Sequence, residues 1–145
     1  MSAERLIASL LRVAKEDLDG ARLLSSARNR NATYLCTQSA EKVIRAVLTS
    51  EGKHAGIKHH LNEMVDLVPD ENPLKPALRS IEHLAAYATS YRYPTASGRI
   101  PAPPSQAVFE EDAARVEASL NAAVARFRVD LTKPDTSAGS AAPIR

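Results

Sequence analysis

Apolar residues recur at every third or fourth position through three long stretches of this chain, and this periodicity restricts the fold more than any other feature. It follows the 3.6-residue turn of an α-helix, which places such residues on one face. We expect helices over residues 3–26, 32–51 and 105–130. Their apolar stripes are Leu6, Leu10, Ala14, Leu18, Ala21 and Leu24 in the first, Cys36, Ala40, Val43, Ile44, Val47 and Leu48 in the second, and Val108 or Phe109, Ala113, Val116, Leu120, Ala123, Val124 and Phe127 in the third. No segment alternates as a strand does, so the sequence predicts an all-α, up-and-down bundle of four or five helices.

Residues with turn and capping chemistry separate these helices. Asn31 follows a polar turn and is expected to cap the second helix through its side-chain oxygen. Gly52 suits the end of that helix, because glycine adopts a left-handed backbone without strain. Ser105 is expected to cap the last helix. These residues indicate that the helix boundaries are encoded locally.

Two further helices are expected between the second and the last. The first is short, covers residues 60–68, and ends at the proline-rich break of residues 69–73. The second covers residues 74–91, with Leu78, Ile81 and Leu84 facing inward, and ends before Pro94. Residues 92–104 form the longest loop expected inside the domain, and long ordered loops in compact domains often carry function.

The length and composition limit the classes of protein that fit. The chain has 145 residues, which is enough for one domain, and we expect that domain over residues 1–131 with a disordered tail over residues 132–145. The formal charge of +2 excludes a strongly basic nucleic-acid coat. A single cysteine, Cys36, rules out an internal disulfide and a cysteine-rich zinc site, and its place on an apolar stripe predicts a packed side chain. With no targeting or membrane-spanning segment, we expect a cytoplasmic protein.

Three motifs together resemble one known family. The segment of residues 34–48 is similar to the signature helix of HEPN domains, which has an aromatic residue followed by Gln-x-Ala-Glu-Lys. Residues 58–61 resemble the Thr-His-Asp-Leu turn of that family, with Lys58 and His60 in place of Thr and Asp. Residues 92–94 resemble its Arg-Tyr-Pro ending of the fourth helix. The matching residues are Tyr34, Gln38, Glu41, Lys42, His59, Leu61, Arg92, Tyr93 and Pro94.

This resemblance implies a helical bundle that forms a homodimer. It also implies a nucleotide-associated interaction module that partners a minimal nucleotidyltransferase in a two-component, toxin–antitoxin-like system. Some HEPN domains are metal-independent ribonucleases that use an Arg and a His separated by four to six residues. Here Arg79 and His83 have only three residues between them. We therefore assign no catalytic residue and expect no cofactor other than a nucleotide.

Four side chains are candidates for binding a nucleotide or RNA: Lys42, His59, His60 and Arg92. Cationic side chains, and arginine above all, suit phosphate because they donate charge-assisted hydrogen bonds. An alternative is a ribonuclease toxin with a divergent dimer-cleft site built from Arg92 with His59 or His60. A further alternative is a structural bundle without a ligand, in which these polar groups fix the register of the helices. The histidines lack the converging ligands of a zinc site, so no metal is expected.

Overall fold

The computed structural model describes residues 3–56 and 60–133. Within them, three long helices form the bundle: α1 (Ala3–Ser26), α2 (Asn31–Ser50) and α6 (Gln106–Phe127). Four short helical segments connect α2 to α6: α3 (Leu61–Asp66), α4 (Lys75–Arg79), the 3-10 turn η1 (Glu82–Ala86) and α5 (Tyr87–Ser90). The described residues contain no strand, so the predicted all-α bundle is confirmed. The predicted tail lies outside the described residues from position 134 onward.

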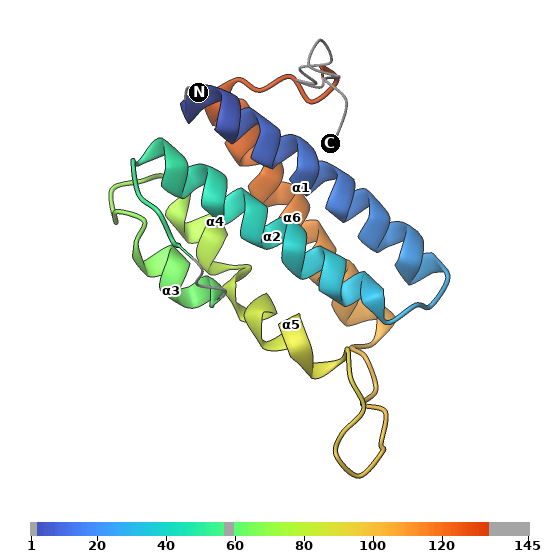
Figure 1. Ribbon diagram of the computed structural model, residues 1–145. Helices are drawn as coiled ribbons and strands as arrows, with labels where there is room; N and C mark the ends of the chain where they lie inside the picture. The colour runs from blue at the N-terminus through green and yellow to red at the C-terminus, as the bar shows by residue number, and fades with distance from the viewer. Residues whose placement is uncertain (1–2, 57–59, 134–145) are drawn as a thin grey trace, which may run out of the picture.

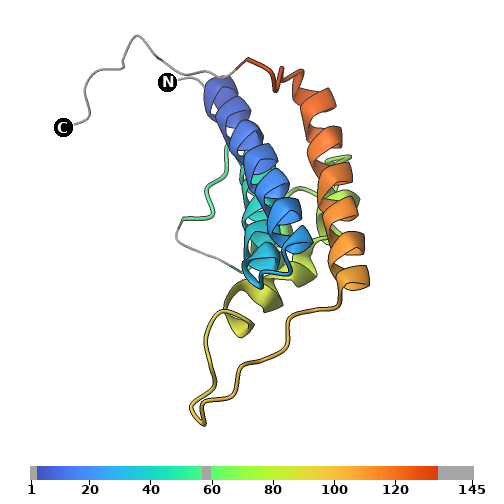
Figure 2. The ribbon, with the colours of Figure 1, turned by 90° about the vertical axis from the view of Figure 1, so that its right-hand side faces the viewer.

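Helix α2 is the centre of the molecule. Helix α1 packs antiparallel along it, and α6 contacts both (Figure 1). The short segments α3, η1 and α5 contact α2 as well, away from α1. Figure 2 shows the three long helices side by side, with the segment between α5 and α6 extending beyond one end of the bundle. The two loops at that end therefore lie close together.

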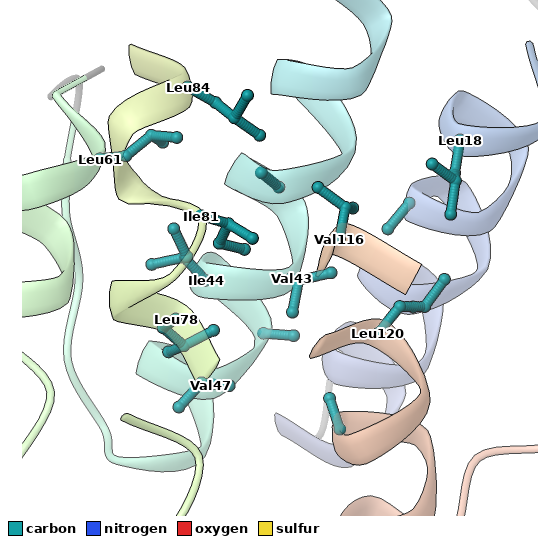
Figure 3. Packing of buried hydrophobic residues seen from close by; sticks show 14 of the residues in the cluster. Leu18, Val43, Ile44, Val47, Leu61, Leu78, Ile81, Leu84, Val116 and Leu120 are labelled. Atoms are coloured by element: carbon teal, nitrogen blue, oxygen red, sulfur yellow. The ribbon is translucent and has the colours of Figure 1, made fainter. Parts of the chain in front are cut away.

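The hydrophobic core joins α2 to every other part of the bundle. Ile44 and Ile81 are fully buried, as their positions on the apolar stripes predicted. Figure 3 shows Ile44 beside Ile81 and Leu78 on one side of α2, while Val43 faces Val116. Burial of such side chains from water is the main stabilising contribution in a bundle of this size.

The predicted apolar stripe of α1 is rotated by one residue in its first half. Ile7 and Leu11 are buried there, whereas Leu6 is 38% exposed and Leu10 is half-buried. The prediction of Leu6 on the buried stripe was therefore wrong, whereas Leu10 is partly buried and packs against the core. Both stripes share Ala14, Leu18 and Ala21, and one residue along a helix turns the side chain by about 100°. At the other end, the predicted Leu24 is likewise only half-buried.

The beginning of α2 also differs from the prediction. Asn31 does not cap this helix, because it is the first helical residue, and the N-cap position is Arg30, without a side-chain cap bond. The backbone N–H of Asn31 donates to Oδ1 of Asn29 at 2.8 Å. The asparagine two positions earlier thus forms an Asx turn that leads the chain into α2. The other expected caps are confirmed: Ser105 accepts from the N–H of Val108 at 3.2 Å, and Gly52 has a φ of 69°.

The expected continuous helix over residues 74–91 is broken. It is divided into α4, η1 and α5, with Ile81 at φ −116° and ψ −1° between the first two. Leu78, Ile81 and Leu84 remain buried, as predicted. They are spaced by three residues, which is the period of a 3-10 helix, so the change of helix type keeps all three on one side.

Candidate functional site

Arg30 joins the two loops at the end of the bundle. Its Nη1 donates to the backbone carbonyl of Tyr91 at 3.0 Å and to that of Pro101 at 2.9 Å. These two residues lie where the loop of residues 91–104 leaves the bundle and returns to it (Figure 1). Arg30 therefore closes the neck of this loop against the α1–α2 turn.

The tip of the same loop is held by its own backbone. The N–H of Thr95 donates to the carbonyl of Arg99 at 2.7 Å, and Oγ1 of Thr95 accepts from the N–H of Arg99 at 3.0 Å. Gly98 supplies the positive φ of 86° that this tight turn needs. With its neck and its tip both bonded, the loop is an ordered projection.

Arg92 stacks on aromatic rings beside this neck. Its guanidinium carbon lies 4.1 Å from the ring centroid of Tyr34 on α2 and 5.5 Å from that of Tyr93. A guanidinium over an aromatic face is attracted by the electrons of the ring, and it keeps its N–H donors free at its edge. Arg92 thus presents hydrogen-bond donors toward solvent.

The arginines at this end have no carboxylate partner among the described residues. They are Arg28, Arg30, Arg92 and Arg99. Other arginines are paired with carboxylates, such as Arg22 with Glu117 at 3.1 Å and Arg79 with Asp66 at 2.7 Å. This end of the bundle therefore has an excess of positive charge.

A cavity of about 180 Å³ opens between these loops and the start of α6. Arg28 and Arg30 line it from the α1–α2 turn, and Pro103 and Phe109 line it from the other side. The first turns of α2 and α6 contain no acidic residue. Because two arginines and no acidic residue among the described residues line the cavity, and helix N-termini carry partial positive charge, the cavity is suited to an anion.

The other predicted binding residues do not gather here. Nζ of Lys42 forms an ion pair with Asp17 of α1 at 2.5 Å, so its charge is compensated. Lys42 lies eight residues from Tyr34 along α2, a rise of about 12 Å. His60 is exposed just before α3, and His59 lies outside the described residues. Of the four candidates, only Arg92 is placed among the unpaired arginines.

Arg79 and His83 do not form a shared site. Arg79 pairs with Asp66 and with Glu82, both at 2.7 Å. Nε2 of His83 instead lies 2.8 Å from Oδ1 of the buried Asp112 on α6. The break between α4 and η1 thus separates the two residues, and their side chains contact different partners.

Cys36, as predicted, is a packed side chain. It is 1% exposed, and burial is the main reason that the pKa of its thiol rises to about 12. The described residues contain no group of three potential His, Cys, Asp or Glu metal ligands. Within the same residues, no helix is both long and apolar enough to cross a membrane.

A comparison with protein families identifies the fold. The model of the HEPN domain matches residues 7–124, which cover α1 to most of α6. This chain belongs to the HEPN domain family. No curated protein and no solved structure matches it.

The HEPN signature residues of α2 occupy its partly exposed side. Tyr34, Gln38, Glu41 and Lys42 are all half-buried, at spacings that place them along one face. Glu41 pairs with Arg45 at 3.0 Å. In this HEPN domain, Lys42 of the signature thus bonds to α1 through Asp17, while the ring of Tyr34 lies under Arg92. Of the other motif residues, Leu61 is buried, and Tyr93 and Pro94 are exposed in the loop.

The sequence prediction missed Arg28, Arg30 and Arg99 as site residues. A signal for them is present in the distribution of acidic residues. Residues 20–40 and residues 83–109 contain no Asp or Glu, although the chain has 17 of them. The fold brings these two segments into contact through Arg30, so their arginines belong to one end of the bundle.

Proposed function

We propose that this HEPN domain is a nucleotide-binding interaction module whose arginine-rich end holds the phosphate groups. The observation that supports this most strongly is the group of four arginines, Arg28, Arg30, Arg92 and Arg99, without a carboxylate partner among the described residues. Uncompensated cations repel one another, and a bound anion relieves that repulsion.

In this proposal the phosphate groups bind in the cavity and the base binds outside it. Its volume of about 180 Å³ is below the ~300–1,000 Å³ of typical small-ligand pockets, so it suits the phosphate part of a nucleotide. Arg28 and Arg30 line it and can each donate hydrogen bonds to phosphate oxygens. The base then lies outside, toward the exposed ring of Tyr93 and the guanidinium of Arg92, which offer stacking surfaces.

The proposal extends to assembly. We infer a homodimer that works with a minimal nucleotidyltransferase in a toxin–antitoxin-like pair, which is the arrangement implied by the HEPN family. The projecting loop supports a protein contact, because Tyr93 and Ile100 are 62% and 69% exposed on it. A loop that is ordered before binding loses little conformational entropy when a partner covers it. A mass of twice 15.6 kDa in solution would support the homodimer.

The test is nucleotide binding by calorimetry with ATP and GTP. Arg28→Gln and Arg92→Gln should each weaken binding by about tenfold, since a hydrogen bond to a charged group contributes about 1.5–3 kcal/mol. The matched control is Arg126→Gln, which removes an exposed arginine near the far end of α6 and should leave binding unchanged. Equal losses in all three variants would contradict a specific site.

An RNA cleavage assay distinguishes the ribonuclease alternative from the binding proposal. Cleavage that persists with a chelator and disappears in Arg92→Ala would replace the binding proposal by that alternative. If the protein binds neither ATP, GTP nor RNA, and a co-expressed nucleotidyltransferase does not co-purify with it, the structural alternative is left.

A further inference from the structure

A second groove lies on the other side of the bundle from the site above and does not depend on the proposed function. It has a volume of about 300 Å³ and runs between the beginning of α1, the end of α2 and the segment of residues 53–56. Its apolar wall consists of Leu6, Leu10, Leu48 and Ala55. Leu6 and Leu10 are the two residues that the stripe of α1 predicted for the core, and here they line the groove.

The segment of residues 53–56 is shaped to close one end of this groove. Glycines with positive φ angles of 69° and 63° bound it, at Gly52 and Gly56. Arg45 holds it to α2, because its Nη1 donates to the carbonyl of Gly56 at 3.3 Å while its Nε donates to Glu41. Ala55 is buried, so its methyl group packs inward and the segment is anchored at both ends.

Two cationic residues, Lys53 and Arg45, line the groove together with His54, and no acidic residue does so among the described residues. Arg45 is itself paired with Glu41 at 3.0 Å. The ammonium group of Lys53 has no ion-pair partner in the described part of the chain. Apolar side chains on one wall and cationic groups at one end fit a molecule that has an apolar body and one anionic group.

From this arrangement we infer that the groove binds a small anionic amphiphile, namely a carboxylate with a short apolar chain. The apolar chain lies on Leu6 and Leu10, and the carboxylate accepts hydrogen bonds from Lys53 and His54. The size favours a small molecule over a protein, since a stable protein interface covers roughly 800 Å² on each partner and the exposed apolar surface here comes mainly from Leu6.

The experiment uses the full chain and two probes. Anilinonaphthalene sulfonate, which is anionic and apolar, should bind at one saturable site and report by its fluorescence. Octanoate should displace it at concentrations at least tenfold lower than octanol, which has the same chain without the charge. ATP should not displace it, because the arginine-rich end is a different site. Displacement by ATP, equal displacement by octanol or the lack of a saturable site would overturn the inference.

Four variants locate the binding. Leu6→Gln and Lys53→Gln should each weaken octanoate binding at least fivefold. Leu23→Gln, on the same helix but 72% exposed elsewhere, and Lys133→Gln should change it less than twofold. Circular dichroism melting checks that each variant is folded, and all four positions are exposed enough to tolerate the change. Equal losses in the control variants, or a change of oligomeric state in Leu6→Gln, would show that the groove does not hold a small molecule.

Discussion

Ser39 and Thr37 illustrate how single polar residues fix the position of α2. Both are buried. The hydroxyl of Ser39 donates to the carbonyl of Ala14 on α1 at 2.7 Å, whereas that of Thr37 donates within α2 to the carbonyl of Thr33 at 2.9 Å and lies 3.3 Å from the carbonyl of Leu84. A buried hydroxyl without a partner would be destabilising by about 1–3 kcal/mol, so the Ser39 bond favours one alignment of α2 with α1. Cys36 lies beside them and is held by packing alone.

Cys36 should be chemically inert in the folded protein. Its pKa of about 12 keeps the thiol protonated near pH 8, and the thiolate is the form that reacts with alkylating reagents. We expect labelling by iodoacetamide near pH 8 to be on the order of 100-fold slower or more in the native state than in concentrated guanidinium chloride. Mass spectrometry measures both rates. Rapid labelling of the native protein would mean that α1 and α2 open at this point.

At the scale of elements, the sequence predicted where the helices lie better than it predicted which face of α1 is buried or which segment is a 3-10 helix. The long periodic stripes of α2 and α6 predicted their buried sides, because many residues share one phase. The α1 stripe was misplaced because its early residues Leu6, Ile7, Leu10 and Leu11 offer two phases, and contacts with α2 and α6 decide between them. The 3-10 segment was missed although the repeat of three residues from Leu78 to Leu84 indicates it.

The candidate site was predictable to a similar extent. The motif ending at Pro94 predicted Arg92, and its stacking on Tyr34 follows from two motifs that the fold brings together. Lys42 could not be judged from sequence, because its partner Asp17 is 25 residues away on another helix. Arg30 was missed for the same reason, since its role depends on carbonyl groups 61 and 71 residues further along.

Two glycines should respond in opposite ways to replacement by alanine. Gly20 lies inside α1, where alanine is favoured by about 0.5–1 kcal/mol, and the new Cβ would meet only Cδ1 of the half-exposed Leu35, at 3.2 Å. Because that methyl group can shift, Gly20→Ala should be slightly stabilising, by less than about 1 kcal/mol. Gly52 has open space around it but a φ of 69°, so Gly52→Ala should be destabilising by about 1–2 kcal/mol.

Chemical denaturation of both variants measures this difference. A clear loss of stability in Gly20→Ala would mean that α1 and α2 are packed too closely at Leu35 for the side chain to yield. A neutral Gly52→Ala would mean that the end of α2 can adopt another turn.

At the scale of the whole molecule, the buried core and the arginines without carboxylate partners lie in different regions. The exposed faces of the long helices carry compensated pairs such as Lys15–Asp19 and Arg115–Glu111, each of which contributes little to stability by itself. Four arginines without a carboxylate partner among the described residues, Arg28, Arg30, Arg92 and Arg99, belong to the α1–α2 turn and the loop of residues 91–104. Stability therefore comes mainly from the core around α2, and within the described part of the chain the arginine-rich end contributes no buried pair to it.

We therefore expect substitutions in the core, and not those at the surface, to lower the free energy of unfolding. Ile44 of α2 has no exposed surface and lies against Ile81 and Leu78 of the neighbouring segments (Figure 3). Ile44→Ala should lower the free energy of unfolding by about 2–5 kcal/mol, because it removes buried methyl groups and leaves a cavity. The matched control Leu23→Ala, at a position that is 72% exposed, should change it by about 0.5 kcal/mol or less. Denaturant titration measures both changes, and similar values for the two variants would mean that α2 is not the centre of the folded core.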